Sequence, residues 1–233
     1  MIKKIWQYRW AFRSLIKTLY FNFHYLPFRQ AIKLPILLYK PKLLKCKGTI
    51  EIKGHIKFGM IKLGIYKVSI YPNTGIVFEN HGGKVIFNGE CSIGNNSFVS
   101  IGDEGSVIFG KQFSSSTSIK IASYHNIKFE DCVRVGWDCM FLDTDFHKMK
   151  KLNGGYTKGF GSIVIGERTW IGSKCVLLKN TNVPKYTTIS AGTILNRKID
   201  VPEYSVIGSE NKIIIKSTGL YRDINDDTIE YHR

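Results

Sequence analysis

Hydrophobic residues recur at every sixth position through the C-terminal half of the chain. From residue 165 onward, six consecutive hexads begin with an aliphatic residue, and five of them carry Thr or Cys at the fifth position. The leading residues are Ile165, Ile171, Leu177, Val183, Ile189 and Leu195, and the fifth residues are Thr169, Cys175, Thr181, Thr187, Thr193 and Ile199. A period of six fits neither an α-helix nor a meander of hairpins, and it is typical of a β-solenoid. Each hexad then supplies a short strand and a turn, and three hexads make one triangular coil of about 18 residues.

Looser copies of this pattern lie upstream. "FEDCVRVGWDCMFLDTDF" has Phe129, Val135 and Phe141 as leading residues, and "IGNNSF" and "FGKQFS" are further copies. Residues 101–128 are expected to contain irregular coils. Short strands are predicted in residues 48–90, within "GTIEIKGHIKFG", "VSIYPN" and "IVFENHGGKVIFNG", because apolar residues alternate there between Gly, Asn and Pro. No helix-length pattern appears from residue 48 to about residue 215.

The N-terminal region has a different pattern. Residues 5–23 predict an amphipathic helix, because apolar residues recur at steps of three and four while Arg9, Arg13 and Lys17 follow another face. The segment "YLPFRQAIKLPILLYKPK", which contains three prolines, is expected to pack in an extended or broken form. Two interpretations of the helix remain open. Its apolar face covers the open end of the domain or a subunit contact, or it binds an anionic lipid surface.

Charge is concentrated in the same region. Residues 1–62 hold 14 Lys or Arg and one acid, Glu51, for a net charge of +13, whereas residues 63–233 hold 20 basic and 17 acidic residues, for +3. This basic segment favours peripheral contact with an anionic membrane, although it would also attract other polyanions. It contains no recognisable nucleic-acid-binding module, so nucleic acid is not the expected partner.

The cysteines and the N-terminus bear on the compartment. The chain has five cysteines without a close CxxC pair, and Cys91, Cys132, Cys139 and Cys175 are expected to be small core residues in a reducing environment. Basic residues interrupt the first 20 positions and no small-residue cleavage site follows, so no secretory signal is expected. No apolar run reaches the length of a membrane span. The expected location is the cytoplasm, including the inner face of the membrane.

The stretch "DTDFH" contains candidate chemistry. Asp143 and Asp145 precede His147, and an extended backbone would point all three side chains to the same side. Neutral imidazole suits a general base, and a carboxylate can orient it. A polar turn and a metal site are the alternatives. A metal site is disfavoured because His55, His81 and His125 show no close ligand spacing with His147, so no metal is expected.

The motifs "ERTWIGSKCVLL", "ISAGTILNRKIDVPEYSVIGSENKIIIK" and "DTDFH" resemble the hexapeptide-repeat acyltransferases over roughly residues 85–216. Within that family they are similar to the sugar O-acetyltransferases, which include galactoside and maltose acetyltransferases, and more so to the enzymes of capsule, exopolysaccharide or lipopolysaccharide assembly. The sequence departs from the family at "GSEN", where Gly-Asn-Pro-Ala is usual. The resemblance implies a left-handed parallel β-helix, a handedness that the period alone does not give.

The resemblance also implies roles for individual residues. His147 would be the general base that activates an acceptor hydroxyl toward acetyl-CoA, with Asp145 or Asp143 orienting it. Trp170 would pack on the pantetheine arm, Ser173 would donate its N–H to the thioester oxygen, and the remaining donor-site residues would approach the pantetheine or the phosphates. Those remaining residues are Gly172, Ala191, Gly192, Arg197 and Lys198. Without the resemblance, Trp170 would be interpreted as a core aromatic residue and the small residues as tight packing.

The acceptor side is less well defined by the sequence. The segment "SSSTSIKIASYHN", one coil before the histidine, holds no acid where the sugar acetyltransferases often place Asn and Asp. The polar and aromatic candidates for acceptor binding are Ser116, Tyr124, Trp137, Asp138 and Phe160. This difference suggests an acceptor other than a simple galactoside.

The expected architecture is therefore all-β. It comprises a basic, partly helical N-terminal segment at 1–47, a β-helix domain at 48–216 with an excursion at 148–161, and a C-terminal tail at 217–233. The expected function is transfer of an acetyl group from acetyl-CoA to a saccharide hydroxyl, in a homotrimer with active sites between subunits. The alternatives are an N-acetyltransferase acting on an amino sugar nucleotide and a non-catalytic β-helix scaffold.

Overall fold

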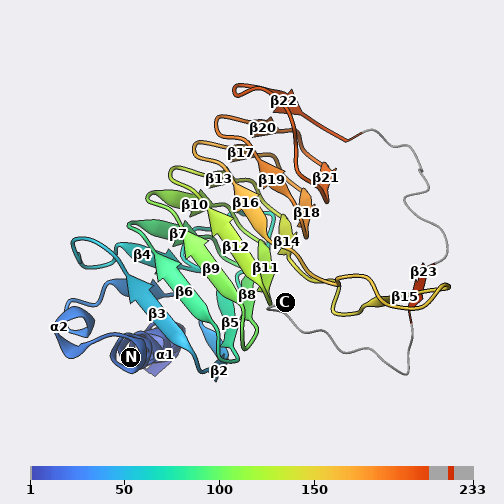
Figure 1. Ribbon diagram of the computed structural model, residues 1–233. Coiled ribbons are helices and arrows are strands. Elements are labelled where there is room, and N and C mark those ends of the chain that lie inside the picture. Colours follow the sequence, from blue (N-terminus) through green and yellow to red (C-terminus); the bar gives the residue numbers. More distant parts are fainter. Residues whose placement is uncertain (1, 210–219, 223–233) are drawn as a thin grey trace.

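The computed structural model describes the backbone of residues 2–209 and 220–222 and the side chains of residues 14–209. Within these residues the chain forms two helices and three parallel sheets of short strands (Figure 1). We call the sheets first, second and third in the order in which the chain enters them. The first sheet contains eight strands, the second seven and the third six.

Three successive strands, one in each sheet, make one circuit of the chain. The first sheet comprises β1 (Ile36–Leu38), β4 (Ile61–Leu63), β7 (Cys91–Ile93), β10 (Phe113–Ser115), β13 (Arg134–Val135), β17 (Trp170–Ile171), β20 (Thr188–Ile189) and β22 (Val206–Ile207). The second comprises β2 (Lys42–Cys46), β5 (Ile76–Asn80), β8 (Ser97–Ile101), β11 (Lys120–Ser123), β14 (Met140–Leu142), β18 (Val176–Leu178) and β21 (Ile194–Leu195). The third comprises β3 (Thr49–Ile52), β6 (Lys84–Phe87), β9 (Ser106–Phe109), β12 (Asn126–Phe129), β16 (Ile163–Ile165) and β19 (Asn182–Val183).

The hexad pattern matches these circuits. Each of the six leading aliphatic residues is buried, and together they pass twice through the third, first and second sheets in that order. Ile171 pairs with Ile189 and Leu177 pairs with Leu195 in adjacent strands, so one circuit takes the 18 residues that the period predicts. The core is therefore a stack of equivalent apolar side chains inside the three sheets.

The turns explain why the fifth residue of each hexad has a small side chain. At the fourth position of the hexads the backbone is left-handed, with φ of 55° at Arg168, 59° at Lys174 and 56° at Tyr186. The next residue turns inward at a tight bend, where Thr169, Cys175 and the later Thr residues are buried. A larger side chain at this point would have to fit between the turn and the stacked core.

Some local predictions are wrong. "VSIYPN" forms a turn, with Tyr71 N–H donating to Val68 O (3.1 Å), and contains no strand. The irregular coils expected at 101–128 are confirmed in length only. The circuits there take 20 or 22 residues in place of 18, but β9 to β12 pair with their neighbours without a register shift. Cys132 is half-buried at a left-handed turn, whereas Cys91, Cys139 and Cys175 are buried as predicted.

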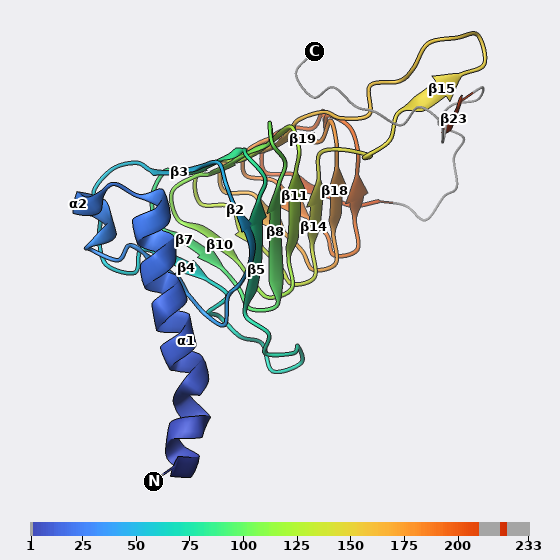
Figure 2. The same cartoon turned by 90° about the horizontal axis from the view of Figure 1, so that it is seen from below.

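The helix expected at residues 5–23 is α1 (Ile2–Tyr25), followed by the short α2 (Phe28–Ala31). In Figure 2, α1 lies against the end of the stack at the first circuit, and its N-terminal part projects beyond the sheets. The strands β1 and β2 fall within residues 1–47, so the parallel sheets begin before residue 48. No helix among the described residues has the length and apolar character needed to cross a membrane.

The helix meets the stack through an unexpected face. The side chains of Ser14, Thr18 and Asn22 are buried against the first circuit, whereas Leu15 and Leu19 are exposed. Helix α1 thus covers the open end of the stack, as one of the two interpretations has it, but the apolar face expected to do so is exposed in the part of α1 whose side chains are described. The physical reason is that the end strand β1 offers unpaired backbone groups, which polar side chains satisfy and apolar ones cannot.

One excursion leaves the stack between β14 and β16. It contains β15 (Met149–Lys151), which pairs in antiparallel fashion with β23 (Leu220–Arg222). Lys150 also bridges Tyr156 across the excursion. The excursion thus lies where 148–161 was expected, and β23 is the one described part of the predicted tail.

Candidate active site

The segment after β14 leads from the second sheet toward the third. We call such connections corner II, and the connections from the first to the second sheet corner I. Asp143 begins the segment and is fully buried. Its Oδ1 accepts a hydrogen bond from Tyr124 N–H (2.8 Å), and its Oδ2 accepts from His125 N–H (3.0 Å) and Ser123 Oγ (2.9 Å). Asp143 therefore ties this corner to the preceding circuit.

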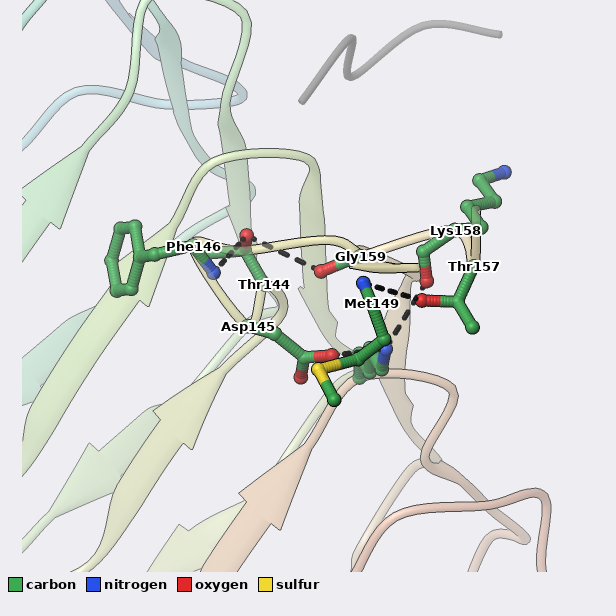
Figure 3. Close-up of polar contacts among 8 residues, drawn as sticks. Thr144, Asp145, Phe146, Met149, Thr157, Lys158 and Gly159 are labelled. Carbon is green, nitrogen blue, oxygen red and sulfur yellow. Dashed lines mark hydrogen bonds and ion pairs between the residues drawn. The ribbon is translucent and has the colours of Figure 1, made fainter. Parts of the chain in front are cut away.

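Asp145 points the other way along the stack. Its carboxylate pairs with Lys179 Nζ, which follows β18 in the next circuit, and Lys179 Nζ also donates to Lys158 O (3.1 Å). Between the two acids the chain turns, with Phe146 at φ 58° and its N–H bonded to Thr144 Oγ1 (3.0 Å) (Figure 3). The prediction that residues 143, 145 and 147 share one side of an extended segment is therefore wrong.

His147 follows this turn and is half-buried. The chain on either side of it is held by the base of the excursion. Asp145 N–H donates to Gly159 O (2.7 Å) and Met149 N–H donates to Thr157 Oγ1 (3.0 Å), as Figure 3 shows for the side-chain contact. The imidazole thus stands between a turn with a fixed backbone and a paired hairpin, which limits how far it can move.

Burial changes the chemistry of Asp143. Removal from water raises the pKa of its carboxyl, although the hydrogen bonds from Tyr124, His125 and Ser123 act in the opposite direction. A buried carboxylate with three donors is suited to holding the backbone in place. It is less suited to exchanging protons with a substrate.

Aromatic side chains surround the same corner. Tyr124 lies edge-on to Phe146 with ring centroids 4.9 Å apart, and His125 packs on Phe160 at the same distance. Phe160 is only 4% exposed and Lys158 Nζ lies over its ring, so the prediction that Phe160 offers a stacking face to an acceptor is wrong. Tyr124 is half-buried, and its hydroxyl lies 3.4 Å from Ser100 Oγ.

A polar groove of about 460 Å³ opens beside this corner, and the sequence analysis did not anticipate it. Asp103 and Glu104 from one circuit meet His125 and Asn126 from the next, and Ser162 borders the groove where the excursion returns. The sequence search for acids covered only the circuit before His147. Asp103 lies two circuits back, and the pairing of Val107 with Ile127 brings its turn alongside. Aligning all circuits of the repeat in the sequence would have placed Asp103 near this corner.

Corner I holds most of the predicted donor-site residues. Lys174 N–H donates to Trp137 O (2.9 Å) and Gly192 N–H donates to Ser173 O (2.9 Å), so three circuits are stacked directly there. A Cβ atom on Gly172 would lie 2.6 Å from the backbone N of Ala191, which explains why residue 172 is a glycine. These bonds also align Ser173 with the small residues at 191 and 192, as expected if the pantetheine arm runs along corner I.

Trp170 lies on β17, just before corner I, and its side chain is 58% exposed. This exposure excludes the interpretation of Trp170 as a core aromatic residue. Arg197 and Lys198 are also exposed, but they belong to corner II, where Lys198 bridges Asn182. Trp170 on the one hand and Arg197 and Lys198 on the other, all predicted for the donor site, thus fall on two different parts of the stack.

The predicted site residues consequently form two groups. Corner I and its approach hold Ser116, Trp137, Asp138, Trp170, Gly172, Ser173, Ala191 and Gly192. Corner II and its excursion hold Tyr124, Asp143, Asp145, His147, Phe160, Arg197 and Lys198. The second sheet separates the two groups within one chain. Among the residues with described side chains, no group of three His, Cys, Asp or Glu is placed to hold a metal ion.

No protein-family model, curated protein or solved structure matches this chain. Its function is therefore inferred from its own motifs and geometry.

Proposed function

We propose that the chain is a left-handed parallel β-helix O-acetyltransferase that moves an acetyl group from acetyl-CoA to a hydroxyl group of a saccharide. The observation that carries the proposal is the combination of an 18-residue circuit with a histidine at the corner where the excursion between β14 and β16 leaves the stack. Loops that project from a rigid repeat are where sites are commonly built. The motif resemblance supplies the reaction class and the hand of the helix.

The proposed reaction begins at His147. Its neutral imidazole takes the proton from the acceptor hydroxyl while that oxygen attacks the thioester carbonyl carbon of acetyl-CoA. The negative charge on the carbonyl oxygen is stabilised by the Ser173 backbone N–H. The C–S bond then breaks, the acetyl ester forms, and the proton held by His147 passes to the departing CoA sulfur. No group is oxidised or reduced.

The acids have positioning roles in this proposal. Asp143 binds the backbone of Tyr124 and His125, and Asp145 pairs with Lys179, so each fixes the turn that carries His147. The contacts assigned to them run to neighbouring circuits. These contacts indicate that both acids serve to hold His147 in position.

The homotrimer in this proposal comes from the motif resemblance, and the separation of the two corners supports it. His147 at corner II and Trp170 near corner I lie on either side of the second sheet in one chain, so one acetyl-CoA cannot be expected to contact both. A neighbouring copy would place its corner I against corner II and complete the site. A fully active monomer at sub-micromolar concentration would contradict this arrangement.

The polar groove is the proposed acceptor site. Saccharide hydroxyls are recognised by carboxylates, amides and hydroxyls, and the groove offers Asp103, Glu104, Asn126 and Ser162. It borders His125, whose N–H is bonded to Asp143 in the histidine-bearing segment. An acceptor seated there would approach the catalytic histidine from the preceding circuits.

The first experiment is calorimetric titration of the purified protein with acetyl-CoA. We expect one site per subunit with micromolar affinity, about −7 to −8 kcal/mol. Trp170→Ala should weaken this binding, whereas His147→Ala should leave it intact and reduce acetyl transfer about 100-fold or more. Capsule-type oligosaccharides serve as hydroxyl acceptors, and amino sugar nucleotides serve as the competing amine acceptors.

Three outcomes would contradict the proposal. A folded protein that fails to bind acetyl-CoA at millimolar concentration would not be an acetyltransferase of this kind. Transfer to amines but not to hydroxyls would make the protein an N-acetyltransferase. Retention of full transfer activity by His147→Ala would remove the histidine from the mechanism.

A further inference from the structure

Helix α1 is attached to the stack through polar side chains and through Phe21, which is fully buried and packs edge-on against Phe78 with ring centroids 5.1 Å apart. Asn22 Oδ1 accepts from Ile36 N–H (3.1 Å), Thr18 Oγ1 accepts from Leu38 N–H (3.2 Å), and Ser14 Oγ accepts from Lys40 N–H (3.0 Å). These three acceptors follow one another at intervals of four residues and therefore lie on one face of the helix. They occupy the backbone donors that β1 and the turn after it present on the side away from β4.

The opposite face of α1 is apolar and exposed. Its residues are between 38% and 51% exposed, and they are Leu15, Ile16, Leu19, Tyr20 and Phe23. At about 100° of rotation per residue, they cover the side of the helix that faces away from Ser14, Thr18 and Asn22. Because the polar face points toward the first circuit, the apolar face points away from the stack.

The apolar surface continues onto α2. The rings of Phe23 and Phe28 are 5.9 Å apart, and Phe28 and Ile32 are both more than half exposed. We call Leu15, Ile16, Leu19, Tyr20, Phe23, Phe28 and Ile32 the end face. A contiguous group of large exposed apolar side chains on a folded protein indicates a binding surface.

Positive charge accompanies the end face. Lys17, Arg29 and Lys33 are exposed within the same two helices and the turn that follows, and residues 1–62 together carry a net charge of +13. A second copy of the chain would bring the same positive charge against it and be repelled. An anionic lipid surface offers both an apolar interior for the exposed side chains and negative headgroups for the cations.

We infer that the end face binds the surface of a membrane containing anionic lipids, with α1 and α2 lying in the plane of the headgroups. The aromatic residues Tyr20, Phe23 and Phe28 enter the boundary between headgroups and acyl chains. Arg29 and Lys33 stay with the phosphates. Lys17 adds charge nearby, but its Nζ donates to Pro41 O (2.8 Å) beside the stack. This inference does not depend on the proposed enzymatic activity, because it uses no residue of either corner.

The test is sedimentation of the full chain with vesicles. One set contains phosphatidylcholine only, and the other contains phosphatidylcholine mixed with anionic phosphatidylglycerol. We expect the wild-type chain to bind the anionic vesicles about tenfold more tightly or better, with binding that weakens as salt is raised. The double variant Leu19→Glu/Phe23→Glu should weaken that binding about tenfold or more. Both positions are exposed, so the fold should be retained, and circular dichroism checks it.

Matched controls separate the contribution of the apolar side chains from that of the positive charges. Leu152→Glu changes an exposed apolar residue in the excursion, far from α1, and should bind vesicles like the wild type. Arg29→Glu/Lys33→Glu should weaken binding to anionic vesicles, whereas Lys151→Glu/Lys174→Glu, with the same charge change elsewhere, should do so much less.

Three results would overturn the inference. The first is a wild-type chain that does not bind anionic vesicles, and the second is a Leu19→Glu/Phe23→Glu variant that binds as well as the wild type. The third is a change in the size of the lipid-free protein, measured by light scattering, when the double variant is compared with the wild type. That result would assign the end face to contact between copies of the chain.

Discussion

Asn22 of α1 and Ile36 of β1 are joined by two hydrogen bonds that imitate a pair of strands. The side-chain amide donates from Nδ2 to Ile36 O (2.8 Å) and accepts at Oδ1 from Ile36 N–H (3.1 Å). A helix side chain thus takes the place of the next strand at the open end of the first sheet. Protection of this edge prevents it from pairing with another chain.

Asn22→Leu should therefore destabilise the protein by about 2–4 kcal/mol, because it leaves a buried N–H and a buried C=O without partners. Chemical denaturation of the full chain measures the change. The exposed Leu15→Ala variant on the same helix serves as control and should change stability by less than about 0.5 kcal/mol. Equal effects of both variants would mean that α1 contributes nothing through this edge.

The buried threonines of the hexads differ in a way that can be measured. Thr193 Oγ1 donates to Ser190 O (2.6 Å), whereas Thr181 Oγ1 is buried with no hydrogen-bond partner among the described residues. Thr181→Val should be neutral or stabilising by up to about 1 kcal/mol, and Thr193→Val should be destabilising by about 1–2 kcal/mol. Thermal unfolding of the two variants tests this order, and the reverse order would contradict it.

Gly172→Ala should destabilise corner I strongly. The added Cβ would meet backbone atoms of the next circuit, Ala191 N at 2.6 Å and Ile189 O at 2.8 Å, and backbone cannot move aside as a flexible side chain can. We expect a loss of about 2–3 kcal/mol in denaturant unfolding. Gly208→Ala is the control, because its nearest neighbour would lie 3.6 Å away. A harmless Gly172→Ala would show that the circuits are not so closely stacked in solution.

Asp143 should make stability depend on pH. Its carboxyl has a raised pKa in the folded protein because burial disfavours the charge, so the folded state holds this proton to higher pH than the unfolded chain does. The contribution of Asp143 to stability therefore falls as pH rises from the ordinary pKa of an aspartate to the raised one, and is constant above it.

Comparison with Asp143→Asn isolates this effect. The variant cannot titrate and replaces one acceptor oxygen with an NH₂ donor, so it should be less stable than the wild type throughout. The gap between the two proteins should narrow as pH rises from about 4 through the window of the shifted pKa. Denaturant unfolding at a series of pH values measures it, and a gap that widens over this range would contradict the assigned direction.

Mixed trimers provide the sharpest test of a shared active site. If His147 and Trp170 act from different subunits, the variants His147→Ala and Trp170→Ala should complement one another when they are refolded together and assayed at an acetyl-CoA concentration too low for the weakened Trp170→Ala site. Random mixing in equal amounts should restore about a quarter of the wild-type sites. Each variant refolded alone is the control. Absence of recovery in mixed trimers would place both residues in sites built by a single subunit.

The sequence predicted the stack well because one period governs both the pattern and the packing. Ile171 and Ile189 had to be equivalent once the repeat was recognised, and they are paired in register. The buried face of α1 could not be obtained in this way. Hydrophobic periodicity identifies an apolar stripe, but Asn22 is buried because the end of the stack requires hydrogen bonds.

The site was only partly predictable for a similar reason. His147 stands at the corner where the excursion begins, as expected. The six-residue pattern ends at this corner, so it no longer predicts which way the side chains point. Asp143 consequently turned back to the circuit before it and Asp145 turned forward to Lys179. Asp103 joined the groove through a strand pairing between residues 20 apart, which a search within one circuit does not reach.

The stacking of circuits also sets a height. Adjacent strands are about 4.8 Å apart, and His147 lies in the fifth circuit while α1 covers the first, so about 19 Å separate His147 from the first circuit along the stack. If the end face rests on a lipid surface, a hydroxyl close to the headgroups cannot reach the histidine. The length of the stack would then set the distance from the membrane at which a hydroxyl can react, so acceptors would have to be carried on a spacer. Inserting or deleting one whole circuit would change which hydroxyl is within reach.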